Sequence, residues 1–466
     1  MAEKDYKPVH GVWTSRWIFV LAATGSAVGL GNLWRFPYIA GENGGGAFVL
    51  VYLLCIVIVG LPIMIAEIGL GRHGGLSPIH TMSKLARQNE VSRAWAGVGY
   101  LGATAGFLLL SFYSVIAGWA LYYIWEIGSG ALREASADTV QASFDGLLAS
   151  PWLLLGLHTG FMIITMGVVA HGVEKGLERA VRFLMPALFV LLLVLLGYSV
   201  RSGGFADGMD FMFSPDFSEL GAQGVLAAMG QAFFTLSLGL GAIMAYGAYM
   251  PREVTKPSGE RKPISIGTTA LMIAGLDTLV AIIAGMAIFP IVFANALEPG
   301  EGPGLIFVTL PLAFADMSGG QIFGTLFFVL VSFAAVSSSI SLGEPLVAWL
   351  VENGLSRKVA ALVIGFSAWF IGIGTVLSFN HWEEMTLWGQ TFFDMLDFMV
   401  SDLMLPLGGL LIAIFAGWVM KEPRIRKEVS IQHFGLYMVW RALVRVFAPL
   451  AVLAVFVNTI WGALAG

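Results

Sequence analysis

The tripeptide Gly-Leu-Gly occurs at Gly29-Leu30-Gly31 and again at Gly239-Leu240-Gly241, inside two of the most apolar stretches of the chain. Each glycine destabilises a helix by about 1 kcal/mol relative to alanine. In a bilayer, a broken helix also leaves N–H and C=O groups unpaired unless they line a cavity or meet a ligand. Close packing of helices is the alternative reason for such glycines. Two matching breaks in the two halves of a chain favour a transporter built from repeats, with its site between discontinuous helices.

The composition places most of the chain in lipid. Of its 466 residues, 57% are hydrophobic and 12% are charged, and the mean hydropathy is +0.82, which is too apolar for a soluble domain. A bilayer-spanning helix needs about 20 apolar residues. We expect eleven spans, at about 13–38, 45–71, 94–127, 151–170, 177–200, 222–250, 264–297, 321–352, 359–378, 391–419 and 434–463. No signal-peptide cleavage site follows the first run, so it is expected to remain as a membrane helix.

The basic residues are unevenly distributed among the loops, and this predicts the orientation. With the N-terminus inside, nearly all Lys and Arg fall on the cytoplasmic side, and only Arg133 and Arg201 lie in the opposite loops, which are acidic. An odd number of spans then places the C-terminus outside. The loops form no basic face that would bind nucleic acid.

The first five spans can be overlaid on the next five, and an odd repeat length inverts the second copy in the membrane. The predicted fold is therefore an all-α integral membrane protein of two inverted five-helix repeats, with helices 1 and 6 discontinuous. The expected segments are a cytoplasmic tail (1–12), repeat 1 (13–201), repeat 2 (221–419) and an eleventh helix (434–464).

Two long motifs resemble the signature of the neurotransmitter:sodium symporters. The first is the segment 25–37, which contains Trp34-Arg35-Phe36-Pro37 and is followed by Glu42-Asn43-Gly44-Gly45-Gly46-Ala47-Phe48; the second is the segment 230–239. The resemblance covers nearly the whole chain. Eleven spans in place of twelve are typical of many bacterial members, so the resemblance implies a multi-pass protein of the bacterial inner membrane.

The resemblance also implies which atoms bind substrate and ions. The substrate carboxylate would lie on the amides of Leu30 and Gly31, with the Tyr113 hydroxyl as a further donor, and the amine would meet Ala27, Phe234, Thr235 and the neighbourhood of Ser237. Sodium site 1 would use Ala27, Asn32, Thr235 and Asp277, and sodium site 2 would use Gly25, Val28, Ala334, Ser337 and Ser338. Serines 337–339 have an alternative role, since membrane serines often bond back to their own helix.

Asp277 is an acid in the middle of an apolar span, which costs about 2.5–3.5 kcal/mol on insertion scales and marks a functional candidate. Family members that need chloride carry a neutral amide at this position and a serine one turn later, where this chain has Ala281. A fixed carboxylate would supply the charge that chloride supplies elsewhere, so we predict chloride-independent transport. The alternative is a protonated structural acid, and a titrating Asp277 would allow proton counter-transport.

Gly29 favours an amino acid substrate, because the monoamine-carrying relatives place an aspartate at this position. The side-chain pocket would be lined by Ser26, Leu109, Phe234, Leu240, Ser338 and Leu342. This lining predicts a neutral hydrophobic substrate such as leucine, methionine, phenylalanine or tryptophan. Ser26 and Leu240 depart from the leucine carrier's asparagine and phenylalanine, and Leu109 and Leu342 have plain helix packing as their alternative role.

The gates also follow from the resemblance. Arg35 and Asp397 would pair as the external gate, with Tyr113 and Phe234 as an aromatic lid. At the inner gate the acid is present as Glu352, but the usual arginine is His10, with Lys7 as a substitute. Gly176 and Pro186 resemble a pair that lets the fifth span unwind, although a membrane proline is often a simple kink.

These observations predict a sodium-coupled symporter that imports a neutral amino acid by alternating access, as a monomer or weak homodimer. No nucleophile–base pair or phosphate loop is present in the sequence, so we expect no enzyme activity. The alternative function is an amino acid sensor that kept the fold and lost transport.

Overall fold

The computed structural model describes residues 11–255, 261–297, 299, 305–431 and 433–465. Almost all of them are helical, as the apolar runs predict. Within this part of the chain, nine continuous helical segments are long and apolar enough to cross a bilayer, and a bent pair adds a tenth. The remaining predicted span, 222–250, which is the sixth along the chain, consists of two shorter helices separated by a break.

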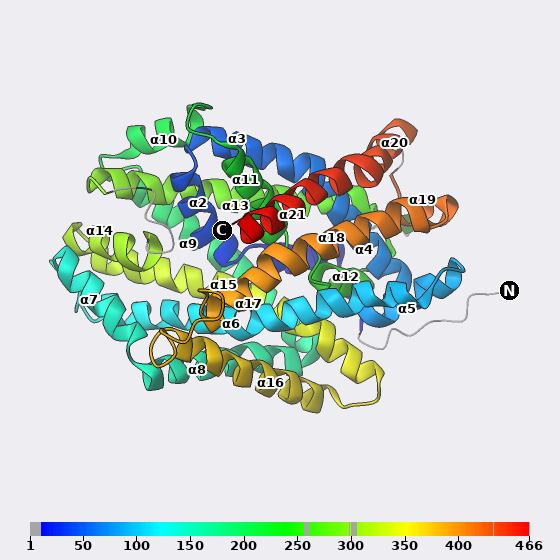
Figure 1. The fold of residues 1–466 in the computed structure, drawn as a ribbon, viewed down its shortest axis with the longest axis horizontal. Coiled ribbons are helices and arrows are strands. Elements are labelled where there is room, and N and C mark those ends of the chain that lie inside the picture. The colour runs from blue at the N-terminus through cyan, green and yellow to red at the C-terminus, as the bar shows by residue number, and fades with distance from the viewer. Residues whose placement is uncertain (1–10, 256–260, 298, 300–304, 432, 466) are drawn as a thin grey trace.

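The first half of the chain supplies the first five predicted spans (Figure 1). They are α1 (Arg16–Ala27) with η1 (Gly31–Arg35) and α2 (Phe36–Glu42); α3 (Gly46–Cys55) with η2 (Ile56–Gly60) and α4 (Leu61–Gly74); α6 (Ala96–Gly128); α8 (Pro151–Ala170); and η4 (Val173–Leu177) with α9 (Glu178–Ser199). The connecting helices are α5 (Pro78–Gln88), η3 (Arg93–Trp95), α7 (Ala137–Leu148) and α10 (Phe205–Phe213).

The second half supplies the rest. Its spans are α11 (Ala222–Thr235) with α12 (Ala242–Ala248); α13 (Ile266–Ala294); α15 (Gly320–Glu352); α16 (Arg357–Ser378); α17 (Phe392–Asp397) with η6 (Phe398–Met404), α18 (Leu405–Ile414) and η7 (Phe415–Val419); and α20 (Phe434–Ala442) with η8 (Leu443–Phe447) and α21 (Ala448–Ala465). The connecting helices are η5 (Leu305–Thr309), α14 (Leu310–Asp316) and α19 (Glu422–Val429).

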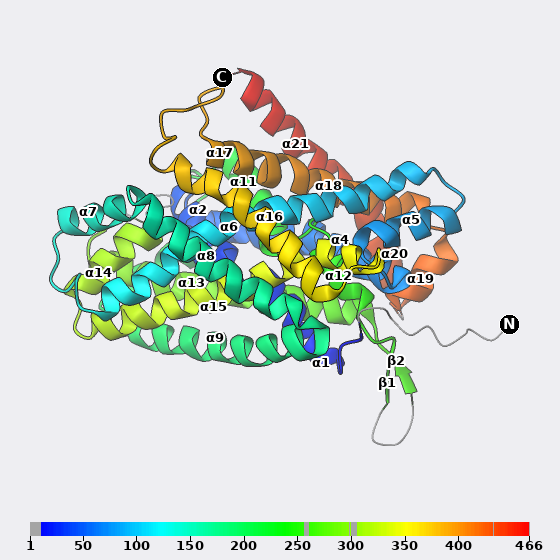
Figure 2. The same cartoon turned by 90° about the horizontal axis from the view of Figure 1, so that it is seen from below.

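A small β-hairpin is the one exception to the predicted all-α fold in the described residues. Strands β1 (Glu253–Thr255) and β2 (Arg261–Pro263) pair antiparallel after α12 and project from the helical body (Figure 2). The apolar-run analysis missed it because both strands are short and polar.

The helices differ in how deeply they are buried. In the most apolar window of α15, 83% of the residues are buried, against 22% in the α20–α21 segment. The long helices α6 and α15 pack along each other, and α1 packs against α15, α9 and α13. The fully buried polar side chains include Thr24, Ser26 and Asn32, all in the first span. The broken first span therefore lies in the protein interior, with its polar groups away from lipid.

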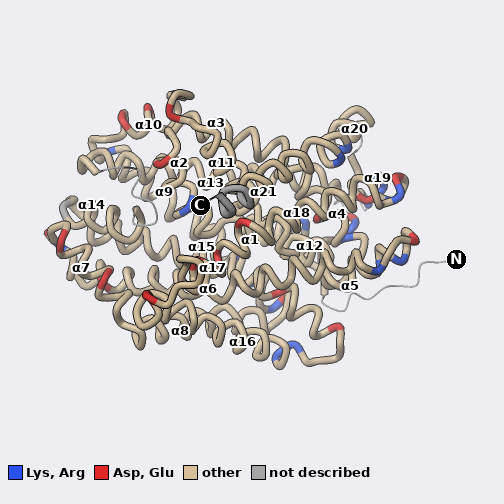
Figure 3. The backbone as a smooth tube through the Cα atoms, in the orientation of Figure 1, with Lys and Arg blue, Asp and Glu red and all other residues tan. Residues whose placement is uncertain are grey.

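Charges are sorted between the two ends of the molecule. Lys and Arg gather at the end that holds α5 and α19, whereas the end with α7 and α10 carries mainly Asp and Glu (Figure 3). This is the asymmetry expected of a membrane protein whose loops obey the positive-inside rule.

Candidate functional site

The first break bends the first span by 53°. Val28, the residue after α1, is extended, with φ −70° and ψ 106°. Where the chain turns helical again, the Asn32 side-chain oxygen accepts the Gly29 N–H at 3.1 Å, reaching back three residues as the third helical residue of a capping box does. The Leu30 N–H points instead to the Tyr113 hydroxyl, at 3.3 Å. This break therefore has backbone carbonyls at the end of α1 and N–H donors at the start of η1.

Asn32, Thr235 and Asp277 form one buried cluster from three separate spans. Asn32 Nδ2 donates to Asp277 Oδ1 at 2.8 Å, and Thr235 Oγ1 donates to Asp277 Oδ2 at 3.0 Å. Each of these side chains is fully buried. Ala27, the remaining residue predicted for sodium site 1, ends α1 and is also buried. All the polar atoms except the amide nitrogen are oxygens, the donor type that hard cations prefer.

The residues predicted for sodium site 2 also converge. Ser338 Oγ lies 3.0 Å from the Val28 carbonyl and 3.4 Å from the Gly25 carbonyl, two acceptors at the end of α1. Ser337 Oγ donates to the Ala334 carbonyl at 2.9 Å. The Ser337 contact is the ordinary back-bond of a helical serine, but Ser338 bridges two helices. Both predicted sodium sites therefore bring together oxygen atoms of the type that an alkali cation prefers.

Tyr113, Phe234 and Ser338 crowd around the two glycines of the first break. A Cβ added at Gly29 would lie 2.4 Å from Ser338 Oγ and 2.8 Å from the Tyr113 hydroxyl. A Cβ at Gly31 would lie 3.0 Å from the Phe234 ring. A Cβ at either position would therefore displace side chains that are predicted to contact substrate.

The other pocket residues are placed as follows. Ser237 Oγ donates to the Ser26 carbonyl at 3.0 Å, and the hydroxyls of Ser26 and Ser341 are 2.7 Å apart. The carbonyls of Leu240 and Leu342 both approach Gly106 of α6. A Cβ added at Gly106 would lie 3.4 Å from the Leu240 carbonyl and 3.3 Å from the Leu342 carbonyl. Of this hydroxyl pair only Ser26 was predicted to line the pocket, because nothing in the sequence relates Ser341 to Ser26.

The predicted external gate residues line a common cavity of about 50 Å³ that includes Tyr113, Phe234, Leu109, Arg35 and Asp397. Arg35 and Asp397 line the same cavity, but among the described residues no ion pair within 4.0 Å joins them, so their direct pairing stays a prediction. The Arg35 guanidinium lies over the Phe234 ring, 4.5 Å from its centroid, and Asp397 accepts the Ser401 hydroxyl at 2.7 Å. The Arg35 cation therefore makes a cation–π contact with the ring face of Phe234, one of the predicted lid residues.

The second break, Leu236–Gly241, has a different support. Ser237, Gly239 and Gly241 all have positive φ, at 52°, 79° and 72°. The Gly239 N–H donates to Glu67 Oε2 on α4 at 3.2 Å, and Glu67 is fully buried. The sequence analysis missed Glu67, although an acid inside the apolar run 45–71 carried the same signal as Asp277.

The inner ends of the two broken spans meet each other. Trp13 donates its indole N–H to the Tyr246 carbonyl at 3.2 Å and its backbone N–H to the Tyr249 carbonyl at 3.0 Å. Tyr249 in turn donates to Glu344 at 2.7 Å, and Glu344 also pairs with Arg357. This buried network on the basic side of the molecule was not expected from the sequence.

The inner-gate prediction is only partly within the described chain, because His10 and Lys7 lie outside it. Glu352 accepts the backbone N–H and the hydroxyl of Ser77, at 2.6 and 2.5 Å. Its Oε2 also lies 2.5 Å from Nδ1 of His80. Ser77 and His80 are therefore partners of Glu352 that the sequence analysis did not name.

Gly176 and Pro186 lie in a fifth span that is helical from Val173 to Ser199. Gly176 belongs to the wide first turn η4, where a Cβ would lie 2.1 Å from the Val168 carbonyl. Pro186 is inside the continuous helix α9. The helix is wound in this structure, so its unwinding stays a prediction.

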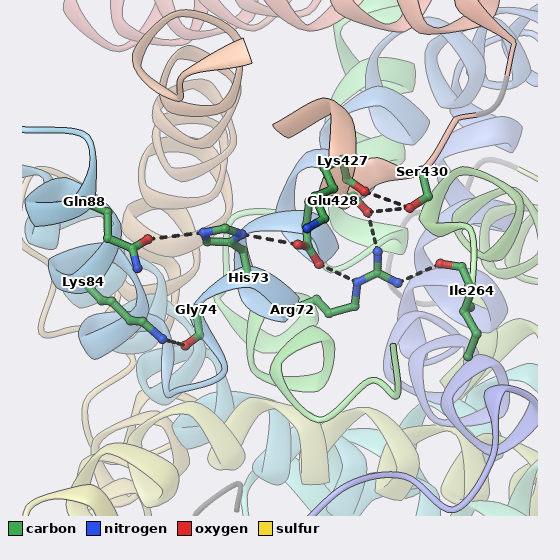
Figure 4. A network of polar contacts seen from close by, with 9 residues as sticks. All are labelled: Arg72, His73, Gly74, Lys84, Gln88, Ile264, Lys427, Glu428 and Ser430. Carbon is green, nitrogen blue, oxygen red and sulfur yellow. Dashed lines mark hydrogen bonds and ion pairs between the residues drawn. The ribbon is translucent and has the colours of Figure 1, made fainter. Parts of the chain in front are cut away.

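A polar network fixes the C-terminal end of α4 (Figure 4). Arg72 Nε pairs with Glu428 of α19 at 2.7 Å and its Nη1 donates to the Ile264 carbonyl at 2.8 Å. His73 lies between Glu428 and Gln88. Burial alone would raise the pKa of the Glu428 carboxyl, but the hydrogen bond with His73 and the charge of Arg72 outweigh it and lower the pKa to about 2.

In the described part of the chain, no three His, Cys, Asp or Glu side chains are grouped as a metal centre. The polar groups at the first break suit a zwitterion and hard monovalent cations: carbonyls and carboxylate oxygens on one side, N–H and O–H donors on the other.

Comparison with known proteins gives consistent results. A family model described as the sodium:neurotransmitter symporter family matches residues 10–143 and 145–464. The chain is 37% identical over 460 residues to the uncharacterized sodium-dependent transporter YhdH of Bacillus subtilis, with 98% of each chain covered. It is 31% identical over 458 residues to a sodium-dependent transporter of Haemophilus influenzae, covering 96% of this chain and 98% of the relative. The crystal structure of MhsT in complex with L-phenylalanine is similar, with a TM-score of 0.88 and 44% identity, covering 96% of this chain and 99% of that one.

Proposed function

Since this chain belongs to the sodium:neurotransmitter symporter family, a family of membrane transporters and not of enzymes, we propose that it imports a neutral, mainly hydrophobic amino acid together with sodium ions. The observation that carries this proposal is the first break, where the Asn32–Thr235–Asp277 cluster lies beside the Leu30 N–H and the Tyr113 hydroxyl. An amino acid zwitterion needs both a donor set and an acceptor set, and this break offers both.

The substrate carboxylate binds at the start of η1. The N–H groups of Leu30 and Gly31 lie at a half-helix N-terminus, where the helix dipole favours an anion. Tyr113 already meets the Leu30 N–H, so its hydroxyl turns to the carboxylate when substrate enters. The amine is taken by carbonyls at the end of α1 and of α11, near Ala27, Phe234 and Thr235.

Two sodium ions are carried as co-substrates. The first binds among Ala27, Asn32, Thr235, Asp277 and the substrate carboxylate, so substrate and ion binding are coupled through a shared oxygen. The second binds among the carbonyls of Gly25, Val28 and Ala334 and the hydroxyls of Ser337 and Ser338, which supports a link between α1 and α15.

Asp277 makes transport independent of chloride. Its carboxylate supplies a permanent negative charge beside the first sodium site, and Asn32 and Thr235 hold that carboxylate in place. Replacing external chloride by gluconate is expected to leave the initial rate of uptake unchanged. A fall of severalfold would contradict this part of the proposal.

The substrate is an amino acid with an apolar side chain. Gly29 leaves no acidic side chain to receive an amine that lacks its own carboxylate, and the lining by Leu109, Phe234, Leu240 and Leu342 is mainly apolar. The complex of the similar MhsT protein with L-phenylalanine supports the same substrate class. The polar exceptions in this lining are Ser338 and Ser26, whose hydroxyl donates to that of Ser341.

Transport proceeds by alternating access between two inverted repeats, 13–201 and 221–419, with the N-terminus in the cytoplasm and the C-terminus outside. Arg35, Asp397, Tyr113 and Phe234 close the outer side. On the inner side, the Trp13–Tyr246 and Tyr249–Glu344 contacts must separate before release. Unwinding at Gly176 and Pro186 opens a path to the second sodium site.

Ligand-dependent thermal stability tests this proposal directly. The purified protein is melted with sodium or potassium chloride in the presence of each of the twenty amino acids. A ligand that binds only the folded state raises Tm, so phenylalanine, leucine, methionine or tryptophan should raise it in sodium and not in potassium. If no neutral amino acid raises Tm in sodium, the proposal fails.

The second candidate function is an amino acid sensor on the same fold. Both sodium-site clusters are intact, which favours transport, because a sensor needs no ion coupling. Proteoliposomes with an inward sodium gradient distinguish the two: a transporter accumulates labelled substrate, whereas a sensor binds it without accumulation.

A further inference from the structure

A groove of about 480 Å³ runs between α8 and α16, on the opposite side of these helices from the broken spans. The two helices lie side by side at the edge of the molecule (Figures 1 and 2). The groove walls are apolar and face outward: Ile163, Leu362 and Phe366 are 68%, 70% and 61% exposed. In the membrane these side chains face lipid.

Two glycines give the groove its shape. Gly365 brings α16 close to α8, because a Cβ there would lie 2.8 Å from Met166 Cγ. Gly167, one residue further along α8, also lines the groove, but a Cβ there would meet nothing within 4 Å. The helices are therefore in contact at Met166 and Gly365 and leave an open channel beside Gly167.

The groove has two defined ends. At one end the indole N–H of Trp369 donates to Thr159 Oγ1 at 2.8 Å and joins the two helices. At the other end lie Ala170 and Lys358. From Thr159 to Ala170 a helix rises about 16 Å, at 1.5 Å per residue. Half of a bilayer's hydrocarbon core is about 15 Å, so the groove spans one leaflet.

Lys358 provides a cation at the open end. Its side chain is exposed, and in the part of the chain that the structure describes it makes no ion pair. Its neighbour Arg357 forms an ion pair with Glu344 and donates a hydrogen bond to the Val169 carbonyl. An apolar groove one leaflet deep with a free ammonium at its mouth matches a lipid with an acyl chain and an anionic head.

From these observations we infer that the α8–α16 groove binds one acyl chain of an anionic glycerophospholipid, with the phosphate at Lys358. Under the orientation proposed above, this lipid belongs to the cytoplasmic leaflet. The site lies outside the substrate and sodium sites, so the inference does not depend on which amino acid is transported.

Native mass spectrometry of the purified, delipidated full-length protein tests this inference. Dioleoyl phosphatidylglycerol and dioleoyl phosphatidylcholine are titrated separately, and the fraction with one lipid bound is measured. We expect phosphatidylglycerol to bind more tightly than phosphatidylcholine. Lys358→Gln should lower that preference by about fivefold, the effect of one lysine near an anionic headgroup, without a change in Tm.

Gly167→Leu fills the groove and should remove the bound lipid. Gly156→Leu is the matched control, since Gly156 is also on α8, also has nothing within 4 Å of its Cβ position, and does not line the groove. Equal lipid binding by these two variants, or no preference for phosphatidylglycerol in the unmodified protein, would overturn the inference. If the unmodified protein forms a dimer and Gly167→Leu abolishes it, the groove binds a second copy of the protein and the inference is overturned. Lipid binding is measured without transport, so the lipid site and the proposed transport function can each fail without the other.

Discussion

The two Gly-Leu-Gly breaks have the same sequence but are built differently. At the second break, Gly239 and Gly241 adopt positive φ, and a Cβ at Gly239 would lie 2.5 Å from the Leu405 carbonyl. At the first break neither Gly29 nor Gly31 has positive φ, and the atoms closest to their Cβ positions belong to side chains, Ser338 Oγ and the Phe234 ring. One break needs glycine for backbone conformation, and the other needs it for side-chain space.

Their polar partners differ as well. The first break meets hydroxyls and amides from Tyr113, Asn32 and Ser338, which can exchange partners with a ligand. At the second break, Gly239 is held by the buried carboxylate of Glu67, and its carbonyl packs against the backbone of Gly102 and Gly408. The first break is therefore suited to bind ligand, and the second to remain fixed while it does so.

Gly239→Ala should have the largest effect. Alanine at φ 79° costs roughly 1–2 kcal/mol, and its Cβ would also clash with backbone that cannot move aside. We expect a large fall in the yield of folded protein and in Tm. Gly230→Ala in α11 is the control; with nothing within 4 Å of its Cβ position, it should keep or slightly raise Tm. Equal behaviour of the two variants would refute the conformational role of Gly239.

Asp277→Asn should abolish most of the response to sodium. The amide keeps the shape of the carboxylate but removes its charge beside the proposed first sodium site. We expect the sodium concentration for half-maximal thermal stabilisation to rise about tenfold or more, roughly 1.4 kcal/mol. Glu67→Gln is the matched change at the second break, and should lower Tm without moving the sodium midpoint. If Glu67→Gln shifts the sodium midpoint as far as Asp277→Asn does, the assignment of ligand binding to the first break alone is wrong.

Gly29→Ala should reduce ligand binding with little effect on the empty protein. Its new Cβ displaces Ser338 Oγ and the Tyr113 hydroxyl, both of which sit on rotatable side chains. We expect the substrate-induced rise in Tm to need about tenfold more amino acid, while Tm without ligand stays nearly unchanged. A loss of folded protein comparable to that of Gly239→Ala would show that both breaks serve the fold alike.

Glu428→Gln should have the smallest effect, and the effect should depend on pH. The pKa of Glu428 is lowered from 4.5 to about 2, so its ionised form stabilises the fold above pH 4.5, and this contribution is lost as the pH falls toward 2. Glu428 holds Arg72 at the end of α4, the helix that also carries Glu67.

The melting temperature of this variant should therefore lie a few degrees below that of the unmodified protein at neutral pH. The difference should shrink below pH 4.5. Glu90→Gln, which removes an exposed partner of Lys421, serves as the control and should change Tm little at any pH. A pH-independent difference for Glu428→Gln would mean that the carboxylate charge is not what stabilises this contact.

Much of the site could be predicted from the sequence because the motifs are long. Asn32, Thr235 and Asp277 were named from three distant segments, and Asn32 and Thr235 both donate hydrogen bonds to Asp277. Glu67 was not named, although an acid inside an apolar run is a signal in the sequence itself. His80 and the Ser26–Ser341 pair were not named because each matters only through a partner far away in the sequence. The Arg35–Asp397 contact depends on which rotamer each side chain adopts, and a motif does not specify rotamers.

The sequence by itself determined that this chain crosses a membrane many times, that two of its spans are interrupted, and that the chain belongs with sodium-dependent carriers. The first two properties follow from apolar length and local backbone preference, and the third follows from the resemblance of two motifs, all of which are features of consecutive residues. Only the tertiary structure decided which break is fixed and which is open to ligand. That distinction rests on contacts made by Glu67, Leu405, Ser338 and Tyr113, all remote in the chain from the glycines they approach.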